Sequence, residues 1–126
     1  FCLFREWLAR AARFLRAVVQ HPHVTFHPGV SIGVGCQFGR QVSVLGNVVL
    51  AQTTVGDYSY IGGASKLKHC TVGRFCSIGA NVQIGLGIHP TNLISTYPGL
   101  YPSEAAGAKH FVKRGQLAES QPVTIG

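Results

Sequence analysis

The side chains that could do chemistry in this chain are six histidines and four cysteines. The cysteines lack the spacing of a metal site, so we expect small core residues with free thiols. Three histidines, His21, His23 and His27, lie close together, and we expect them to be solvated or to cap the fold. No matching ligands recur along the sequence, so no metal site is expected. His89 stands alone before Pro90, as an exposed loop histidine often does.

Basic residues outnumber acidic ones by eleven to four, which leaves a net charge of +7. This balance favours an anionic partner. No nucleic-acid motif is present and the positive residues do not form one run, so nucleic acid is not expected as that partner. Lys109, Lys113 and Arg114 cluster late in the chain. Such a cluster would suit a phosphorylated cofactor such as coenzyme A, and a solvated loop explains it equally well.

The secondary structure that must position these residues is predicted from apolar residues that recur at regular intervals between Ile32 and Ile84. Two steps of six are followed by one step of five, so the whole pattern has a period of seventeen. At this period equivalent positions form three apolar columns: Phe38, Val55 and Val72; Val44, Ile61 and Ile78; Leu50, Leu67 and Ile84. A fixed short period is the signature of a solenoid. We therefore predict a three-sided parallel β-helix whose coils lie about 4.8 Å apart.

Two further features of the repeat bear on the interior of this solenoid. A second, mostly small residue comes four positions after each anchor and is expected to share the interior. These residues are Cys36, Val42, Val48, Ser59, Ser65, Cys76, Val82 and Ile88. Glycine directly follows seven of the ten anchors. Either the backbone turns a corner there, or it runs too close to the next coil for a Cβ.

The first segment has a different period, because its apolar residues recur in steps of four and three from Phe4 to Val18 while arginines project to the opposite side. This pattern predicts an amphipathic helix over residues 1–20, which ends near Gln20 because Pro22 disfavours helical geometry in His21. We expect it to lie over the open rim of the solenoid. The alternative is adsorption to an anionic membrane through its arginine face.

The β-helix domain is expected over residues 21–126, with a long excursion loop at residues 89–121. The rhythm stops there and restarts at Val123-Thr124-Ile125-Gly126. Excursions of this length are usually functional or disordered. Leu93, Ile94, Leu100 and Tyr101 give the first part enough apolar surface to pack as an ordered lobe.

Three runs carry a resemblance to a known family: residues 55–62, 70–79 and 85–92, with Ser95-Thr96-Tyr97-Pro98 after the third. They resemble the hexapeptide-repeat acetyltransferases, and within them the branch that acetylates chloramphenicol, streptogramins and sugar hydroxyls. The hexapeptides alone would indicate only a fold. His89-Pro90-Thr91 followed by Ser-Thr-x-Pro is more discriminating. The likeness covers about residues 24–126, and the left-handed sense of the β-helix comes from it.

In that family a histidine at the position of His89 acts as general base, taking the proton of the acceptor hydroxyl as it attacks the thioester of acetyl-CoA. A positioned base typically contributes about a hundred- to ten-thousandfold. The resemblance also implies Tyr97, Tyr101 and Asn92 at the acceptor pocket, although both tyrosines would equally serve to pack the lobe. Asn92 stands where relatives often carry Asp, and Tyr97 where many sugar-directed relatives carry His.

The resemblance implies acetyl-CoA as the co-substrate. The basic cluster of Lys109, Lys113 and Arg114 is then the candidate for binding coenzyme A, and His110, beside Lys109 and Phe111, is a candidate for touching substrate. Family members continue through further coils, with Asn-Asp-Val-Trp-Ile-Gly-like text directly after the position of Gly126, and these coils supply much of the pantetheine groove. The chain therefore resembles a C-terminally truncated member, and we expect weak or no acetyl transfer from it alone.

The resulting hypothesis is an acetyl-CoA-dependent O-acetyltransferase, a homotrimer that acts on a hydroxyl of a sugar or antibiotic without a metal. With no clear secretory signal and no membrane-spanning run, a cytoplasmic location is expected. The alternative is a truncated β-helix that serves as a self-associating structural or binding module. A third option is a β-helical appendage of a larger enzyme such as a nucleotidyltransferase.

Overall fold

The chain forms two compact units in the computed structural model, which describes all residues except 1, 103–108, 110, 114–116 and 118. The solenoid unit comprises Phe1–Gly85 and Pro122–Gly126, and the loop unit comprises Leu86–Gln121. Within the described residues no helix is both long enough and apolar enough to cross a membrane.

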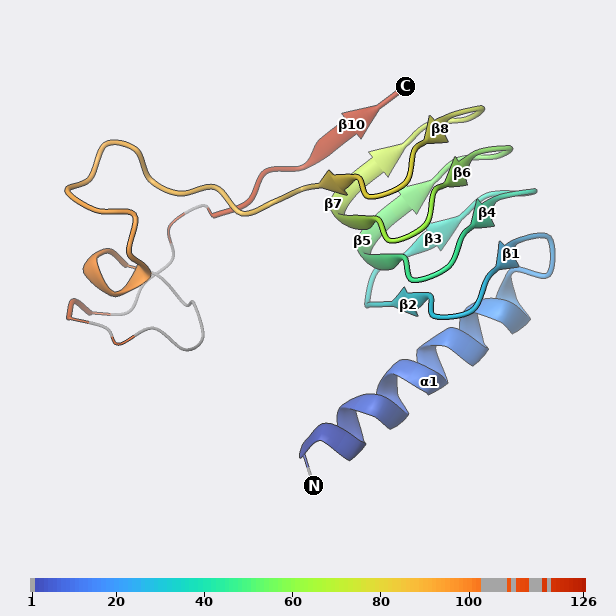
Figure 1. Ribbon diagram of the computed structural model, residues 1–126, viewed down its shortest axis with the longest axis horizontal. Helices are drawn as coiled ribbons and strands as arrows, with labels where there is room; N and C mark the ends of the chain where they lie inside the picture. Colours follow the sequence, from blue (N-terminus) through green and yellow to red (C-terminus); the bar gives the residue numbers. More distant parts are fainter. Residues whose placement is uncertain (1, 103–108, 110, 114–116, 118) are drawn as a thin grey trace. The chain divides into compact units, whose positions relative to one another are not determined.

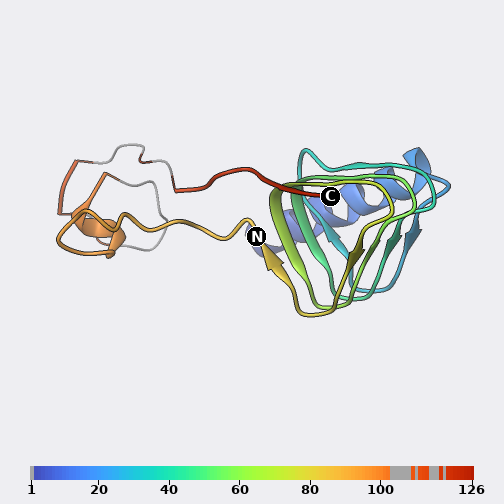
Figure 2. The ribbon, with the colours of Figure 1, turned by 90° about the horizontal axis from the view of Figure 1, so that it is seen from above.

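The solenoid unit is a parallel β-solenoid of about four turns that begins with one helix, α1 (Cys2–Gln20), as predicted (Figure 1). Every described strand pairing is parallel, which fits a left-handed β-helix. The strands are β1 (Thr25–Phe26), β2 (Ser31–Ile32), β3 (Gln37–Phe38), β4 (Ser43–Val44), β5 (Val49–Val55), β6 (Tyr60–Ile61), β7 (Lys66–Val72), β8 (Ser77–Ile78), β9 (Gln83–Ile84) and β10 (Val123–Ile125). Seen from above, successive coils repeat one another's outline (Figure 2).

The strand register confirms the three predicted columns. The pairs Phe38↔Val55, Val44↔Ile61 and Leu50↔Leu67 lie side by side, each one full period apart, and the next coil continues each column. The first coil differs, because the separation between Ser31 and its partner Val49 is one residue longer than the period. The central members of the columns are almost completely buried, so the apolar residues that recur in the sequence form the interior of the prism.

The corners of the prism are made by residues other than the glycines that follow the anchors. Eight non-glycine residues adopt left-handed backbone conformations with φ between 47° and 60°: Gln41, Asn47, Gln52, Tyr58, Ala64, His69, Phe75 and Asn81. This geometry aligns corner amides along the stack. The amide of Tyr58, for example, donates to the carbonyl of Arg40 in the preceding coil at 2.9 Å. These bonds help to offset a conformation that costs about 1–2 kcal/mol in an L-residue.

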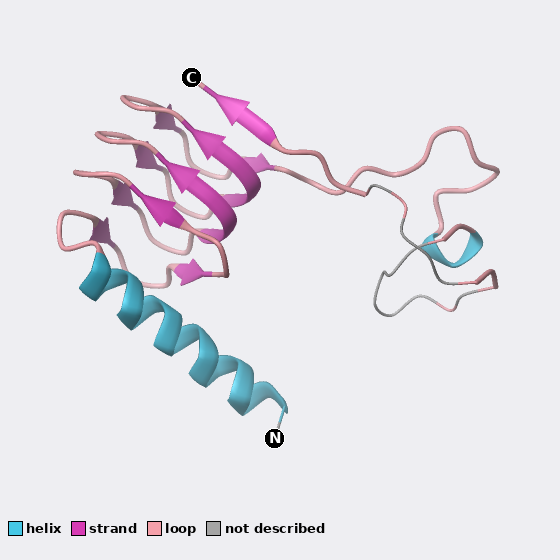
Figure 3. Cartoon of the chain, turned by 180° about the vertical axis from the view of Figure 1, so that it is seen from behind, coloured by secondary structure: helices cyan, strands magenta, loops and turns pink. Residues whose placement is uncertain are grey.

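Six of the seven glycines after the anchors have the second of the two predicted roles, close approach; Gly79 is the exception, and Gly85 in addition has a positive φ of 70°. A Cβ on Gly56 would collide with the backbone of Gly73, and one on Gly62 would collide with the backbone of Gly79. Each glycine therefore lets the next coil approach to strand spacing. Where two anchors are only five residues apart, the strand is not interrupted at the corner. There β5 and β7 run through their corners, at Gln52 and His69, as single long strands (Figure 3).

Small polar residues in the interior satisfy backbone groups at the corners. The hydroxyls of Thr53, Ser59 and Ser65 are buried, and each donates to a carbonyl 14 residues further along, with distances from 2.8 to 3.1 Å. Ser59 also accepts from the amide of Cys76 at 2.9 Å. Of the eight residues predicted to share the interior, seven are buried or half-buried, and one is not. The prediction for Ile88 was wrong: it is exposed and belongs to the loop unit, because the chain leaves the solenoid after β9.

The helix α1 lies along the first coil, where it was expected (Figure 1). The side that faces the coil is not its apolar stripe. Arg13 Nε donates to the carbonyl of Ile32 at 3.1 Å, Phe14 meets Phe26 edge to face at 6.0 Å, and Ala17 is buried. The carbonyls of a first coil have no preceding strand to bond them, and an arginine donor satisfies one of them.

A matched pair of glycine substitutions tests the close-approach role in this chain. We expect Gly62→Ala to lower the free energy of unfolding by about 1–3 kcal/mol, because the added methyl must displace the backbone of the coil above. The control is Gly79→Ala in the same column, where a Cβ would meet nothing within 4 Å. Urea denaturation followed by circular dichroism measures both. Equal midpoints for the two variants would refute this role.

Candidate functional site

The loop unit contains most of the residues that the sequence singled out, and a backbone bond closes its neck. The amide of Ile88 donates to the carbonyl of Glu119 at 2.7 Å, so the outgoing and returning arms lie side by side. His89 follows this bond directly and is exposed, whereas Pro90 is buried. A histidine is thus held at the base of the excursion by a proline packed into the unit.

The excursion is an insertion into an otherwise regular solenoid. Val123 of β10 pairs with Cys70 of β7, a position that the period of the solenoid would give to residue 87. The difference, 123 − 87, means that 36 residues are inserted. Ile125 in turn pairs with Val72 and continues its column. The solenoid therefore resumes in register after the excursion.

The interior of the loop unit is formed around a short 3-10 helix, η1 (Pro98–Leu100). The amide of Phe111 donates to the carbonyl of Gly99 at 2.8 Å, and the amide of Lys109 donates to the Tyr97 hydroxyl at 3.1 Å. The segment around Lys109 therefore runs beside η1. Gly99 is buried, since a Cβ there would strike the Lys109 carbonyl and the Tyr97 ring.

The two tyrosines proposed for the acceptor pocket have different surroundings. Tyr101 is only 1% exposed and packs inside the loop unit. Burial raises the pKa of its phenol, and the neighbouring Glu119 carboxylate raises it further. Tyr97 keeps 43% of its surface exposed while its hydroxyl receives the Lys109 amide. Of the two, Tyr97 is the ring that a ligand could reach.

The other proposed site residues lie on the surface of the same unit. Asn92, Lys109 and Lys113 are exposed, and the Lys109 ammonium lies 5.6 Å from the centroid of the Phe111 ring. Arg114 and His110 lie outside the described residues. Within the described residues, neither His89 nor Asn92 makes a side-chain hydrogen bond. The structure thus brings Tyr97 and Lys109 together by a direct bond and leaves His89 and Asn92 open to solvent.

The cysteines and the remaining histidines lie in the solenoid unit. Cys36, Cys70 and Cys76 are free thiols, and burial raises the pKa of Cys36 and of Cys70. His21 packs edge to face on Phe38 at 5.5 Å, and His69 makes a corner. Among the described residues, no three His, Cys, Asp or Glu side chains gather closely enough to hold a metal ion.

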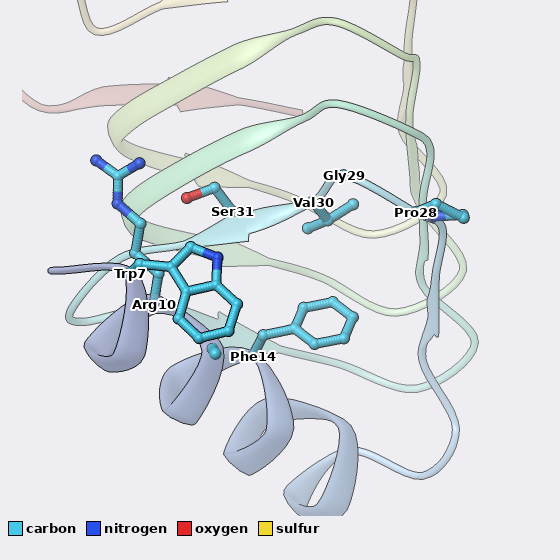
Figure 4. Close-up of a pocket in the computed structure, with 8 residues that line it drawn as sticks. Trp7, Arg10, Phe14, Pro28, Gly29, Val30 and Ser31 are labelled. Carbon is cyan, nitrogen blue, oxygen red and sulfur yellow. The ribbon is translucent and has the colours of Figure 1, made fainter. Parts of the chain in front are cut away.

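Two cavities in the solenoid unit were not anticipated from the sequence. One, of about 360 Å³, lies between α1 and the first coil and is lined by residues including Trp7, Arg10 and Phe14 (Figure 4). A second, of about 300 Å³, has Arg13, Arg16 and His21 in its wall. Both depend on which face α1 turns toward the coil, and helical periodicity alone does not determine that face.

Comparison with known proteins gives no information about function, so the functional proposal rests on the fold and on these residues. No protein-family model matches the chain, and no curated protein matches it.

The packing of the loop unit can be tested with two of its glycines. We expect Gly99→Ala to open the loop unit, because its methyl group would strike the Lys109 carbonyl, and amide hydrogen exchange within Leu86–Gln121 should accelerate at least about tenfold. The control is Gly87→Ala, where the nearest atom to a Cβ is the Glu119 carbonyl oxygen at 3.7 Å, an ordinary contact. Unchanged exchange in Gly99→Ala would contradict the observed packing.

Proposed function

We propose that this chain is the catalytic part of an acetyl-CoA-dependent O-acetyltransferase of the hexapeptide-repeat type, with His89 as general base. The observation that carries the proposal is the in-register insertion. A hexapeptide solenoid is interrupted once in the described chain, between β9 and β10, and an exposed histidine stands at the neck of the inserted unit. Functional residues often lie on loops that a rigid scaffold positions.

The reaction needs only one proton acceptor from this chain. The imidazole of His89 takes the proton of the acceptor hydroxyl while the hydroxyl oxygen attacks the carbonyl carbon of the thioester. The carbon–sulfur bond then breaks, the acetyl ester remains on the acceptor, and the proton passes to the departing CoA sulfur. A thioester is already activated, so no covalent enzyme intermediate is required. Histidine suits this role because its ordinary pKa lies near neutral pH.

We assign the acceptor to the surface around Tyr97 and Asn92. The exposed ring of Tyr97 offers an apolar wall, and its hydroxyl is held by the Lys109 amide, which limits the rotation of the side chain. Aromatic walls with polar tips suit sugars and apolar drugs. Tyr101 supports this surface from within the unit.

Coenzyme A is assigned to the basic cluster of Lys109 and Lys113, together with Arg114. The two described lysines are exposed, and charge attraction would hold the phosphates of the cofactor there. In the homotrimer that we propose, this cluster and His89 would serve a site between neighbouring subunits.

One observation supports the alternative, a self-associating module without catalysis. Within the described part of the chain, β8, β9 and β10 each pair with a strand on one side only. Such edges accept a further strand, either from a longer chain or from another molecule. Sedimentation velocity combined with acetyl-CoA calorimetry separates the two functions: self-association without any acetyl-CoA binding would favour the module.

The role of His89 is tested by its removal. We expect His89→Ala to lower kcat for CoA release with sugar or antibiotic acceptors by about a hundred- to ten-thousandfold, because the hydroxyl then loses its base. Acetyl-CoA binding by calorimetry should not change. The control is His23→Ala, which removes an exposed histidine of the solenoid unit. Equal rates for His89→Ala and the wild type would remove His89 from the mechanism.

The cofactor assignment is tested by charge removal. The double variant Lys109→Ala/Lys113→Ala should raise KM for acetyl-CoA about three- to tenfold with kcat little changed, since exposed ion pairs each contribute at most about 1 kcal/mol. Lys66→Ala/Lys68→Ala removes the same charge from exposed positions of β7 and should leave KM unchanged. A similar rise in both double variants would indicate general charge attraction instead of a site.

A further inference from the structure

The outward side of α1 carries an apolar stripe. Its members recur at helical spacing, and each is exposed: Phe4 63%, Leu8 46%, Leu15 63%, Val18 42% and Val19 79%. Side chains at steps of three, four and seven residues lie on one face of a helix. Exposed apolar patches of this kind mark interaction surfaces.

The stripe is not the surface that holds α1 to the solenoid. That contact is made by Arg13 and Ala17, which lie on the other side of the helix, and by Phe14, which lies between that side and the stripe, four residues before Val18. Because the guanidinium of Arg13 is bonded to Ile32 and Ala17 is buried, the rotation of the helix about its own axis is determined. The apolar stripe therefore points away from the first coil.

The charged residues of α1 indicate which kind of partner would bind the stripe. Arg5 and Arg16 are exposed and eleven residues apart, so they lie along the same flank of the stripe. Glu6 is the single acidic residue of α1, and it stands nine residues from Leu15, on the opposite side of the helix. Two copies joined stripe to stripe would bring arginines together without a facing carboxylate. An apolar surface covered with anionic groups matches both the apolar stripe and the arginines that flank it.

The single tryptophan of the chain lies at the edge of the stripe. Trp7 is 63% exposed, and Figure 4 shows it projecting from α1 with Phe14 toward the segment that contains Pro28 and Val30. Trp prefers the boundary between apolar and aqueous surroundings, which is the depth that an in-plane helix occupies in a bilayer. The apolar surface thus continues from the stripe to the cavity beside Trp7.

We propose that α1 is an interfacial anchor that lies in the plane of an anionic lipid bilayer, with its apolar stripe among the acyl chains and Arg5 and Arg16 on the headgroups. A helix of 19 residues is about 28 Å long, and arginine-rich helices with one apolar side bind lipid in this way. The first coil then faces the aqueous side. This anchoring is independent of the acetyl transfer proposed above.

Vesicle binding by the whole chain tests the proposal, with the emission of Trp7 as a direct probe. We expect cosedimentation with phosphatidylcholine vesicles that contain about one third phosphatidylglycerol, and a blue shift of Trp7 emission on binding. Pure phosphatidylcholine should bind at least about fivefold more weakly. Raising the salt from about 0.05 to 0.5 M should weaken binding to the anionic vesicles, because salt screens the arginines.

A matched pair of substitutions identifies the surface. Leu15→Glu places a charge in the stripe and should weaken binding about tenfold or more, while Ile94→Glu makes the same change at an exposed residue of the loop unit and should leave binding unchanged. Glu retains helix propensity, and circular dichroism checks that α1 remains folded. Equal binding by the two variants, equal binding to neutral and anionic vesicles, or no vesicle binding would overturn the proposal. It would also be overturned if the wild type self-associates without lipid and Leu15→Glu does not, because a second copy would then cover the stripe.

Discussion

Registered stacking of parallel coils is the constraint on which the solenoid depends. Each coil pairs its strands with those of the next, and between the first turn and the insertion the paired residues are one period apart. At that spacing nothing larger than hydrogen fits where Gly56 and Gly62 approach the following coil. The interior consists of columns of equivalent side chains, so no coil buries its apolar residues without its neighbours.

The corners show how this constraint overrides local preference. Left-handed backbone is unfavourable for Gln, Tyr, Phe or His, yet five such residues adopt it: Gln41, Gln52, Tyr58, His69 and Phe75. The conformation persists because it directs corner amides toward carbonyls of the preceding coil, and because Thr53, Ser59 and Ser65 bond further backbone groups from inside. Side-chain type matters little at a corner, whereas alignment with the neighbouring coil matters greatly.

The insertion and the helix use the two ends of this stack differently. The excursion leaves after β9 and returns as β10 in register with β7, so a separate unit is attached without disturbing the columns. That unit has its own interior around Tyr101 and Gly99, while the exposed His89 stands at its neck. The helix α1 covers the first coil with Arg13, Phe14 and Ala17, which leaves its most apolar side free for another surface.

The sequence alone predicts four features, because each is a repeating pattern of side-chain types: the period of the repeat, the apolar columns, the helix up to Gln20 and the restart at Val123. A sequence pattern does not determine which way an individual side chain points in the folded chain. Only the tertiary structure shows that most glycines after the anchors provide close approach, that Arg13 faces Ile32, and that Tyr101 is buried while Tyr97 is exposed. Those outcomes depend on contacts between residues far apart in the chain, such as a first-coil carbonyl that lacks a preceding strand.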